Sequence, residues 1–354
     1  MIQRWKILRE LGRVGQQLRA IPEAIWEPLA QRRHDSAFAR GFALSEGQVP
    51  LTAKVALVLV WQPRGLERSI IDLCHHLVAQ GYAPFIVSNA PLLPVDLARL
   101  MPLVWRVMER PNFGYDFGGY RDGVWQLQLW GVVPGRLVIL NDSVWFPLWP
   151  DCTLLQRMED SPGDLAGTVL RERGAEMFLE SYALSLPTTT WQHPAFVAFW
   201  RDLRLTSNKY KVIRRGERGF GRALQAAGLS LTGVYGTGEF LERIAGADDV
   251  MLRATLRHAA FVDPAMARAA GDWATATGPD WREDAMAFVR GSLGSALFYC
   301  TYPVAAAVLM TYPVLKKSME PVSLRWRRAF FAAVDAGVVP QILPAVEHEA
   351  RARL

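Results

Sequence analysis

Leu137-Val-Ile-Leu-Asn-Asp-Ser-Val-Trp-Phe-Pro-Leu148 is the segment of this 354-residue chain that says most about its fold. Residues 138–140 form a short unbroken apolar run, which is typical of a strand covered on both faces of its sheet. Asn141, Asp142 and Ser143 follow at the carboxyl end of that strand, where open α/β sheets bind their ligands. The segment therefore predicts a buried strand that ends in a ligand-binding turn.

A second polar turn precedes it, in Arg110-Pro-Asn-Phe-Gly-Tyr-Asp-Phe-Gly-Gly-Tyr-Arg-Asp-Gly123. Gly114, Gly118 and Gly119 allow the backbone to approach a ligand closely where a helix begins, a setting that suits phosphate. Asp116 would then bind the hydroxyl groups of a nucleotide or sugar. The alternatives are a plain tight turn for the glycines and a helix cap for Asp116. Two polar turns at neighbouring strand ends favour a binding site.

Alternating apolar patterns indicate the rest of the fold. The expected strands are residues 54–61, 83–88, 103–108, 137–140, 165–170 and 178–186, the last of them antiparallel. The expected helices are residues 66–80, 194–205 and 220–227, and a further helix that follows the 112–119 turn and runs through Trp130. This alternation predicts an α/β fold with a mostly parallel sheet covered by helices. We expect a basic N-terminal helical segment over 1–50, the sheet domain over 51–247 and a mainly helical region over 248–354.

At these motifs the chain resembles the rhamnan synthesis F family of bacterial polysaccharide glycosyltransferases. The resemblance is carried by Asn112-x-Gly114-x-Asp116-x-Gly118-Gly119-Tyr120, by Leu140-Asn-Asp-Ser143 and by Ser181-Tyr182, and it covers residues 55–228. It implies a nucleotide-sugar fold of the GT-A type and transfer of a sugar, typically rhamnose, into a surface polysaccharide. Residues after Asp248 do not share the resemblance.

The resemblance also implies roles for individual residues. Acceptor binding is expected at Ser181 and Tyr182. Donor binding is expected at the residues of the two polar turns, which are Asn112, Gly114, Asp116, Gly118, Gly119, Tyr120, Arg121, Asn141 and Ser143.

Asp142 is the candidate metal ligand. Asn141-Asp142-Ser143 lies where many GT-A enzymes carry Asp-x-Asp, so one carboxylate stands here in place of two. A divalent cation, Mg²⁺ or Mn²⁺, can be held by one carboxylate together with the phosphates of the donor. A metal-independent site would use cationic side chains, with Arg121, Arg214 and Arg215 as the candidates. The structural alternative for Asp142 is a turn-forming residue.

Glu217 is the candidate general base. It follows Lys211-x-x-Arg214-Arg215 and precedes an expected helix. An inverting transfer needs a carboxylate near the acceptor hydroxyl, on the face opposite the leaving group. The alternative is a Glu that complements the dipole at a helix start. Asp142, Asp116 and Glu180 are the other candidate bases, and Asp142 is the second expected catalytic residue.

The positive charge is concentrated at two places. The chain carries a net charge of +6, and residues 1–33 and 316–328 each contribute +4. Nucleic-acid binders spread basic residues along a face with interleaved aromatics, so this distribution favours a membrane surface over nucleic acid. Residues 2–19 have near-helical apolar spacing, which predicts either a helix on an anionic membrane or a helix packed on the domain.

Gly291–Leu315 is a run of 25 residues without a charge. Two prolines and three tyrosines interrupt it, so a buried helical hairpin and a monotopic or re-entrant membrane contact are both open. A simple spanning helix comes third. The cysteines at 74, 152 and 300 show no pairing pattern, which fits a reducing compartment.

The sequence thus indicates an inverting glycosyltransferase on the cytoplasmic face of a bacterial inner membrane. It would use a dTDP- or UDP-activated deoxysugar and a glycan or lipid-linked acceptor. The alternative from another class is a non-catalytic nucleotide-sugar-binding or glycan-binding subunit of a membrane polysaccharide assembly, which the missing second carboxylate suggests. A nucleotidyltransferase is a weaker enzymatic alternative.

Overall fold

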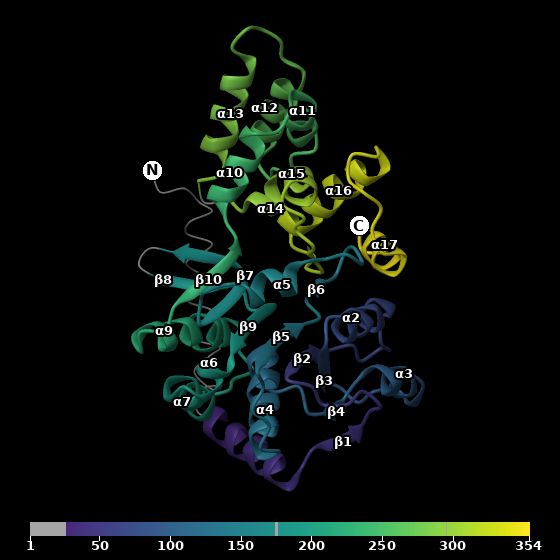
Figure 1. The fold of residues 1–354 in the computed structure, drawn as a ribbon, viewed down its shortest axis with the longest axis vertical. Helices are drawn as coiled ribbons and strands as arrows, with labels where there is room; N and C mark the ends of the chain where they lie inside the picture. Colours follow the sequence, from purple (N-terminus) through teal and green to yellow (C-terminus); the bar gives the residue numbers. More distant parts are fainter. Residues whose placement is uncertain (1–25, 174–175, 295) are drawn as a thin grey trace.

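A mixed sheet forms the centre of the molecule (Figure 1). The computed structural model describes residues 26–173, 176–294 and 296–354. Within them the sheet has nine strands in the order β1-β4-β3-β2-β5-β9-β7-β10, and β8 pairs with β7. These strands are β1 (Ala43–Glu46), β2 (Lys54–Val60), β3 (Tyr82–Ser88), β4 (Arg106–Glu109), β5 (Arg136–Asn141), β7 (Leu165–Arg173), β8 (Glu176–Leu179), β9 (Ala183–Pro187) and β10 (Leu231–Tyr235).

Most strands of the sheet share one direction. β2, β3, β4 and β5 are mutually parallel, with Leu57 of β2 opposite Phe85 and Ile139. β9 runs against β5, β7 runs against β9, and β10 is parallel to β7. In the described residues only β1, β8 and β9 therefore point the other way. The predicted fold class, a mostly parallel sheet covered by helices, is confirmed.

Alternate side chains of β2 point into two hydrophobic cores, one on each face of the sheet. Leu57 and Leu59 face one core, which α4 (Tyr115–Leu129), α7 (Pro194–Asp202) and α9 (Arg218–Ala226) cover. Ala56 and Val58 face the other core. That second core is covered by α2 (Arg68–Ala79) and α5 (Leu154–Glu159) and by the C-terminal helices. Because both faces are covered, the strands read as continuous apolar runs.

Glycines let α4 lie close to the sheet. A Cβ on Gly119 would lie 2.2 Å from Leu59 Cδ1, and one on Gly123 would lie 2.5 Å from Leu57 Cδ1. A Cβ on Gly118 would meet the carbonyl oxygen of Phe113 at 2.0 Å. Packing of α4 therefore accounts for the glycines at 118 and 119, and their expected part in donor binding stays a prediction.

Three sequence expectations for the strands are wrong in detail. The strand expected over 178–186 is two strands, β8 and β9, because residues 180–182 leave the ladder to make site contacts. The strand expected from residue 103 begins at Arg106, since Met101–Leu103 forms a 3₁₀ turn that contains Pro102. The edge strand β1 was not expected, because Ala43–Glu46 shows no apolar run.

Short helices fill the region after β10. They are α10 (Thr237–Ala245), α11 (Asp249–Arg257), α12 (Pro264–Thr275), α13 (Trp281–Ser292), α14 (Phe298–Thr301), α15 (Pro303–Val308), α16 (Pro321–Asp335) and α17 (Pro344–Arg351). Figure 1 shows α10–α16 beyond one end of the sheet and α17 beside α2. Their buried side chains belong to the same core as Ala56 and Val58, so the core continues across the boundary expected near residue 247.

The apolar run Gly291–Leu315 lies mostly inside this core. Tyr299, Tyr302 and Tyr312 are all buried, and Tyr299 stacks on Tyr312 with ring centroids 4.7 Å apart. Of the two interpretations left open by the sequence, this burial favours the helical segment packed inside the protein. No helix in the described residues is both long enough and apolar enough to cross a bilayer.

Two short strands connect the C-terminal region to the sheet. β6 (Val144–Trp145) directly follows the Asn141–Ser143 turn, and β11 (Leu315–Lys316) pairs with it in antiparallel register. The backbone N–H of Lys317 donates to the carbonyl of Ser143 at 2.9 Å. Glu349 of α17 adds a second connection, since it accepts from Ser69 N at 2.9 Å and Trp145 Nε1 at 3.0 Å.

Candidate active site

Three carboxylates gather at the carboxyl edge of the parallel strands. Asp142 follows β5, and Asp116 lies in the first turn of α4. Glu217 directly precedes α9 in the chain. Each of the three is half-buried, so it remains reachable from solvent. The charges of Asp142 and Glu217 both raise the pKa of Asp116, which places the three groups within electrostatic range of one another.

Asp142 is fixed by the backbone of the neighbouring strand. Its Oδ2 accepts from Trp61 N at 2.9 Å, and its own N–H donates to Leu59 O at 3.1 Å. Burial raises the pKa of Asp142, while the Trp61 N–H and the charge of Lys317 act against that rise. The side chain is thus oriented before any ligand binds.

Asp116 is held at an unusual pKa. Burial, and then the negative charges of Asp142 and Glu217, raise its pKa to about 6, and Lys209 opposes the rise. Asn141 Nδ2 approaches Asp116 Oδ2 at 3.3 Å. Two nearby like charges and low hydration together explain a carboxyl that titrates close to neutrality.

Glu217 ends a π-helical segment, Ile213–Glu217. Such segments are rare and occur often at functional sites, because the extra residue redirects a side chain. Gly216 makes the segment possible here, since a Cβ at that position would lie 2.4 Å from the Phe117 ring of α4. Ser181 Oγ donates to Glu217 Oε2 at 2.7 Å, and burial raises the pKa of Glu217.

A chain of hydrogen bonds connects these groups. Asn141 Nδ2 donates to the hydroxyl of Tyr120 at 2.8 Å, and that hydroxyl donates to the carbonyl of Ser181 at 2.8 Å. Ser143 N donates to Asn141 Oδ1 at 3.0 Å. Tyr120, Asn141 and Ser181 therefore position the carboxylates, and their expected ligand contacts stay predictions.

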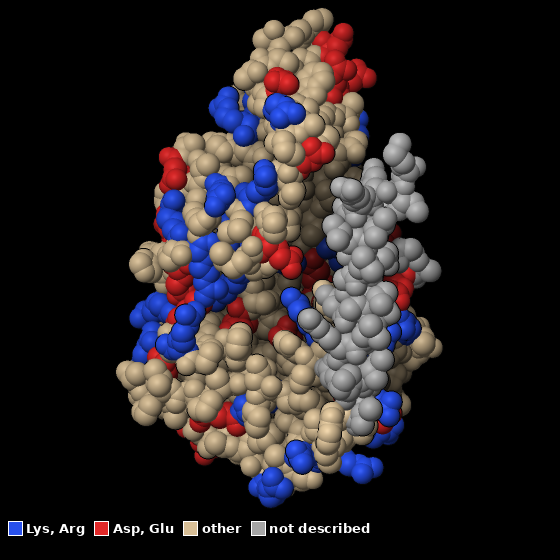
Figure 2. All heavy atoms as spheres, turned by 180° about the vertical axis from the view of Figure 1, so that it is seen from behind, with Lys and Arg blue, Asp and Glu red and all other residues tan. Residues whose placement is uncertain are grey.

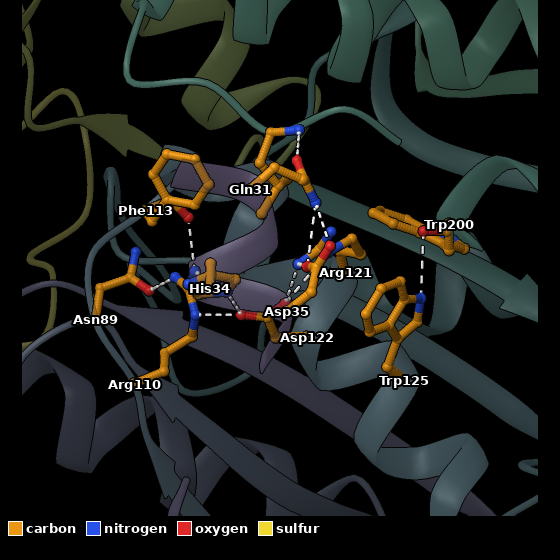
Figure 3. A network of polar contacts seen from close by, with 11 residues as sticks. Gln31, His34, Asp35, Asn89, Arg110, Phe113, Arg121, Asp122, Trp125 and Trp200 are labelled. Atoms are coloured by element: carbon orange, nitrogen blue, oxygen red, sulfur yellow. Dashed lines mark hydrogen bonds and ion pairs between the residues drawn. The ribbon is translucent and has the colours of Figure 1, made fainter. Parts of the chain in front are cut away.

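The structure brings Arg121 into a different network (Figure 3). Its guanidinium is fully buried and pairs with Asp35 at 2.7 Å and Asp122 at 3.1 Å. Asp122 also accepts from Arg110 Nε at 2.6 Å and contacts His34 Nε2 at 2.7 Å. This network attaches the helix at residues 26–40 to α4. Because Arg121 is fully engaged there, we do not retain it as a donor ligand.

Other expected residues make contacts elsewhere in the protein or are exposed. Arg215 pairs with Glu27 at 3.1 Å, and the Tyr182 hydroxyl contacts Thr168 at 2.7 Å and Tyr312 at 2.6 Å inside the core. Asn112, Ser143 and Arg214 are exposed. The Tyr182 side chain thus contributes to packing, while the exposed residues remain available to a ligand.

Sequence reasoning missed two cations of the site. Lys316 ends β11 and Lys317 follows it. The charge of Lys316 opposes the rise in the pKa of Glu217, and the charge of Lys317 opposes the rise in the pKa of Asp142. In the sequence they read as charges that flank an apolar run. The short β6–β11 pairing carries no sequence pattern that would have placed these lysines near the site.

A hollow on the molecular surface contains acidic side chains. Figure 2 shows it near the middle of the face opposite to that of Figure 1, with basic side chains beside the acidic ones. Among the described residues, no group of three His, Cys, Asp or Glu side chains is arranged as a metal site. A divalent cation at Asp142 would therefore need donor phosphates as further ligands.

Comparison with known proteins agrees with the family resemblance. Residues 85–256 match the model of the family described as rhamnan synthesis protein F, so the suspected resemblance is confirmed over that range. An uncharacterized protein of Sinorhizobium fredii is 34% identical over 246 residues, which are 68% of this chain and 64% of that protein. The chain thus spans less than two thirds of that relative's length.

Two solved glycosyltransferases show distant structural similarity. One is a mannosyltransferase from Pyrobaculum calidifontis in complex with GDP-Man and Mn²⁺, with 11% identity, a TM-score of 0.29, and coverage of 96% of this chain and 90% of that one. The other is GlyE of Streptococcus pneumoniae, with 11% identity, a TM-score of 0.34, and coverage of 83% and 66%. Similarity at this level does not assign a function.

Proposed function

We propose that this protein is a glycosyltransferase that moves a sugar from a nucleotide-sugar donor to a glycan or lipid-linked acceptor. The observation that carries the proposal is the group of three half-buried carboxylates at the carboxyl edge of β2 and β5. Ligands of open α/β sheets bind at this edge. The match to a rhamnan synthesis family supports a role in polysaccharide synthesis.

Each carboxylate has a distinct role in the proposal. Glu217 is the general base, oriented by the Ser181 hydroxyl, and its raised pKa brings its basicity closer to working pH. Asp142 contacts the donor diphosphate through a divalent cation, Mg²⁺ or Mn²⁺. Asp116 binds a hydroxyl of the sugar or ribose. Attack from the face opposite the leaving group would invert the anomeric centre.

The donor class is proposed from the family alone. A dTDP- or UDP-activated deoxysugar, rhamnose first, is the donor that a rhamnan synthesis family supports. The product would be a cell-surface polysaccharide such as a lipopolysaccharide O-antigen.

Donor hydrolysis across a panel of nucleotide sugars tests the proposal. Wild-type protein should release nucleoside diphosphate from at least one donor. Glu217→Gln should bind that donor normally and lower kcat by roughly 10²–10⁴-fold, because it keeps the shape but removes the base. Asp142→Ala should weaken donor binding and turnover together, and a chelator should inhibit the wild type.

The matched control is Glu242→Gln, which alters an exposed carboxylate on α10 away from the site. Donor binding without turnover by the wild type would favour a non-catalytic binding subunit. Normal turnover of Glu217→Gln would exclude Glu217 as the base and leave Asp116 or Glu180. Loss of activity in Asp142→Ala with no effect of chelation would indicate a metal-free site.

We further propose a peripheral location on the cytoplasmic side of the inner membrane, through the basic residues 1–33. Residues 1–25 lie outside the described part of the chain. Each Lys or Arg near an anionic leaflet contributes about 1 kcal/mol, so high salt should release the protein from membranes. Removing residues 1–25 should have the same effect at low salt. Finding the intact protein wholly in the soluble fraction at low salt would contradict this location.

A further inference from the structure

The C-terminal region places two lysines directly beside the candidate site. Lys316 lies opposite Val144 in the β6–β11 pair, and the backbone of Lys317 bonds to Ser143. Both lysines are therefore paired with residues that closely follow Asp142 in the chain. They lie outside the segment that matches the family model. The contacts of each ammonium group determine whether it can bind a ligand.

Lys317 is fully engaged within the protein. Its Nζ pairs with Glu67 Oε2 at 2.5 Å and lies 5.3 Å from the centre of the Trp145 ring. The side chain is 7% exposed, and Glu67 also accepts from Arg353. Lys317 thus offsets the charge of Asp142 from a fixed position and is not available to a ligand.

Lys316 is held more weakly. Its Nζ lies 3.3 Å from Glu180 Oε1 and 5.5 and 5.9 Å from the centres of the Tyr182 and Tyr299 rings, and its side chain is 29% exposed. Glu180 has closer partners, since the Tyr299 hydroxyl donates to its two oxygens at 2.8 and 2.9 Å and Arg171 Nη1 donates at 3.1 Å. Glu180 would therefore stay paired if Lys316 turned toward another anion.

A donor diphosphate that binds here would lie close to three carboxylates. Asp116, Asp142 and Glu217 all raise the cost of bringing a second anion to this edge of the sheet. A cation that is near the carboxylates, partly exposed and loosely paired can lower that cost. Among the described residues of the C-terminal region, Lys316 combines these properties.

We propose that Lys316 of β11 is a binding residue for the anionic diphosphate leaving group, so that the C-terminal region completes the donor site. This inference rests on the proposed function, because it takes the donor to be a nucleoside diphosphate sugar. Lys316 contacts the phosphate oxygens in the ground state and stabilises the charge that grows on them as the glycosidic bond breaks.

The test is binding of UDP, dTDP and GDP, and of the corresponding nucleosides, by calorimetry with and without Mg²⁺. Lys316→Met keeps the length of the side chain but removes the charge, and Lys316→Arg restores a cation. In chelator, Lys316→Met should weaken diphosphate binding at least about tenfold, the equivalent of about 1.4 kcal/mol, and leave nucleoside binding unchanged. Lys316→Arg should recover most of the loss.

Lys54→Met is the matched control. Lys54 begins β2 at the opposite edge of the sheet, is 36% exposed and is likewise paired with one carboxylate, Glu159. Removing its charge should leave diphosphate affinity unchanged. Melting temperatures of all three variants report on folding.

Equal diphosphate affinity of wild type and Lys316→Met would overturn this inference and leave the proposed function intact. An equal loss of nucleoside and diphosphate binding would also overturn it, since that result indicates general damage to the site. A wild type that binds none of the diphosphates would instead contradict the proposed function itself.

Discussion

A single carboxyl group at the site has a measurable cost in stability. Burial and two neighbouring negative charges raise the pKa of Asp116 to about 6 from a usual value of 3.8. The folded protein therefore holds this proton more tightly than the unfolded chain does. Stability from this group is fully present below pH 4 and is lost as the pH rises through 6.

Asp116→Asn should consequently stabilise the protein above pH 7. The gain is at most about 3 kcal/mol, because the pKa differs by about two units between the two states. Asn keeps an oxygen that can accept from Asn141. Urea unfolding at pH 8 and pH 4 measures the effect, which should be large at pH 8 and nearly absent at pH 4. An equal change at both values would show that packing, and not charge, causes it.

Individual site residues were predictable where the pattern was local. Asp142 and Asp116 follow strand and helix signals in short segments, so both could be placed at one sheet edge from the sequence. Arg121 was misplaced because its side chain points from α4 toward Asp35, on a helix at residues 26–40 that the motifs do not include. Lys316 was missed because its partner strand is far away in the chain.

Among the elements, the π-helical segment Ile213–Glu217 is the one on which the site most depends. Gly216→Ala would place a Cβ 2.4–2.9 Å from three atoms of the Phe117 ring. The segment must then move away from α4 and take Glu217 with it. We expect kcat to fall at least about tenfold with donor affinity nearly unchanged, because a displaced base affects the chemical step. Steady-state kinetics and donor titration provide the measurement.

Gly219→Ala is the control for this experiment. Its Cβ would have nearest neighbours at 3.4 and 3.7 Å, which are ordinary contacts, so activity should be kept. The double variant Gly216→Ala/Phe117→Leu removes the ring and should recover part of the turnover. Wild-type kcat in Gly216→Ala alone would show that the position of this segment does not matter for the reaction.

Strands and helices were predicted well where helices cover both faces of the sheet or where a helix has one regularly spaced apolar face. β2, β3 and β5 carry unbroken apolar runs because helices cover both faces, and α2 shows its buried Ile70, Leu73 and Leu77 at helical spacing. The edge strand β1 and the two-residue strands β6 and β11 have no such period. Tertiary pairing determines them, so no local pattern could have shown them.

At the scale of the molecule, the C-terminal helices share a core with the sheet. A chain that ends at residue 247 would expose apolar side chains that the C-terminal region now covers, such as Tyr235 beside Tyr312, Phe240 beside Phe298 and the part of α2 beside α17. We expect such a chain to aggregate or to lack a cooperative unfolding transition, because a large apolar surface is left uncovered. Soluble yield and thermal unfolding by circular dichroism test this.

The full chain, expressed in parallel, is the reference. A soluble 1–247 chain with a sharp transition would instead support the division into 51–247 and 248–354 that the sequence suggests. The charge-free run at 291–315 could not reveal this shared core, because a buried segment and a lipid-facing segment have the same composition.

The β6–β11 pair also affects how the protein is made. Val144 meets Lys316 across a long stretch of intervening chain, and contacts of this kind close late in folding. During synthesis the strands β2–β5 leave the ribosome well before their C-terminal partner exists. A nascent chain would therefore lack Lys316 and Lys317 and the C-terminal part of its second core until residue 317 has emerged, and on the proposal above donor turnover would begin only after that point.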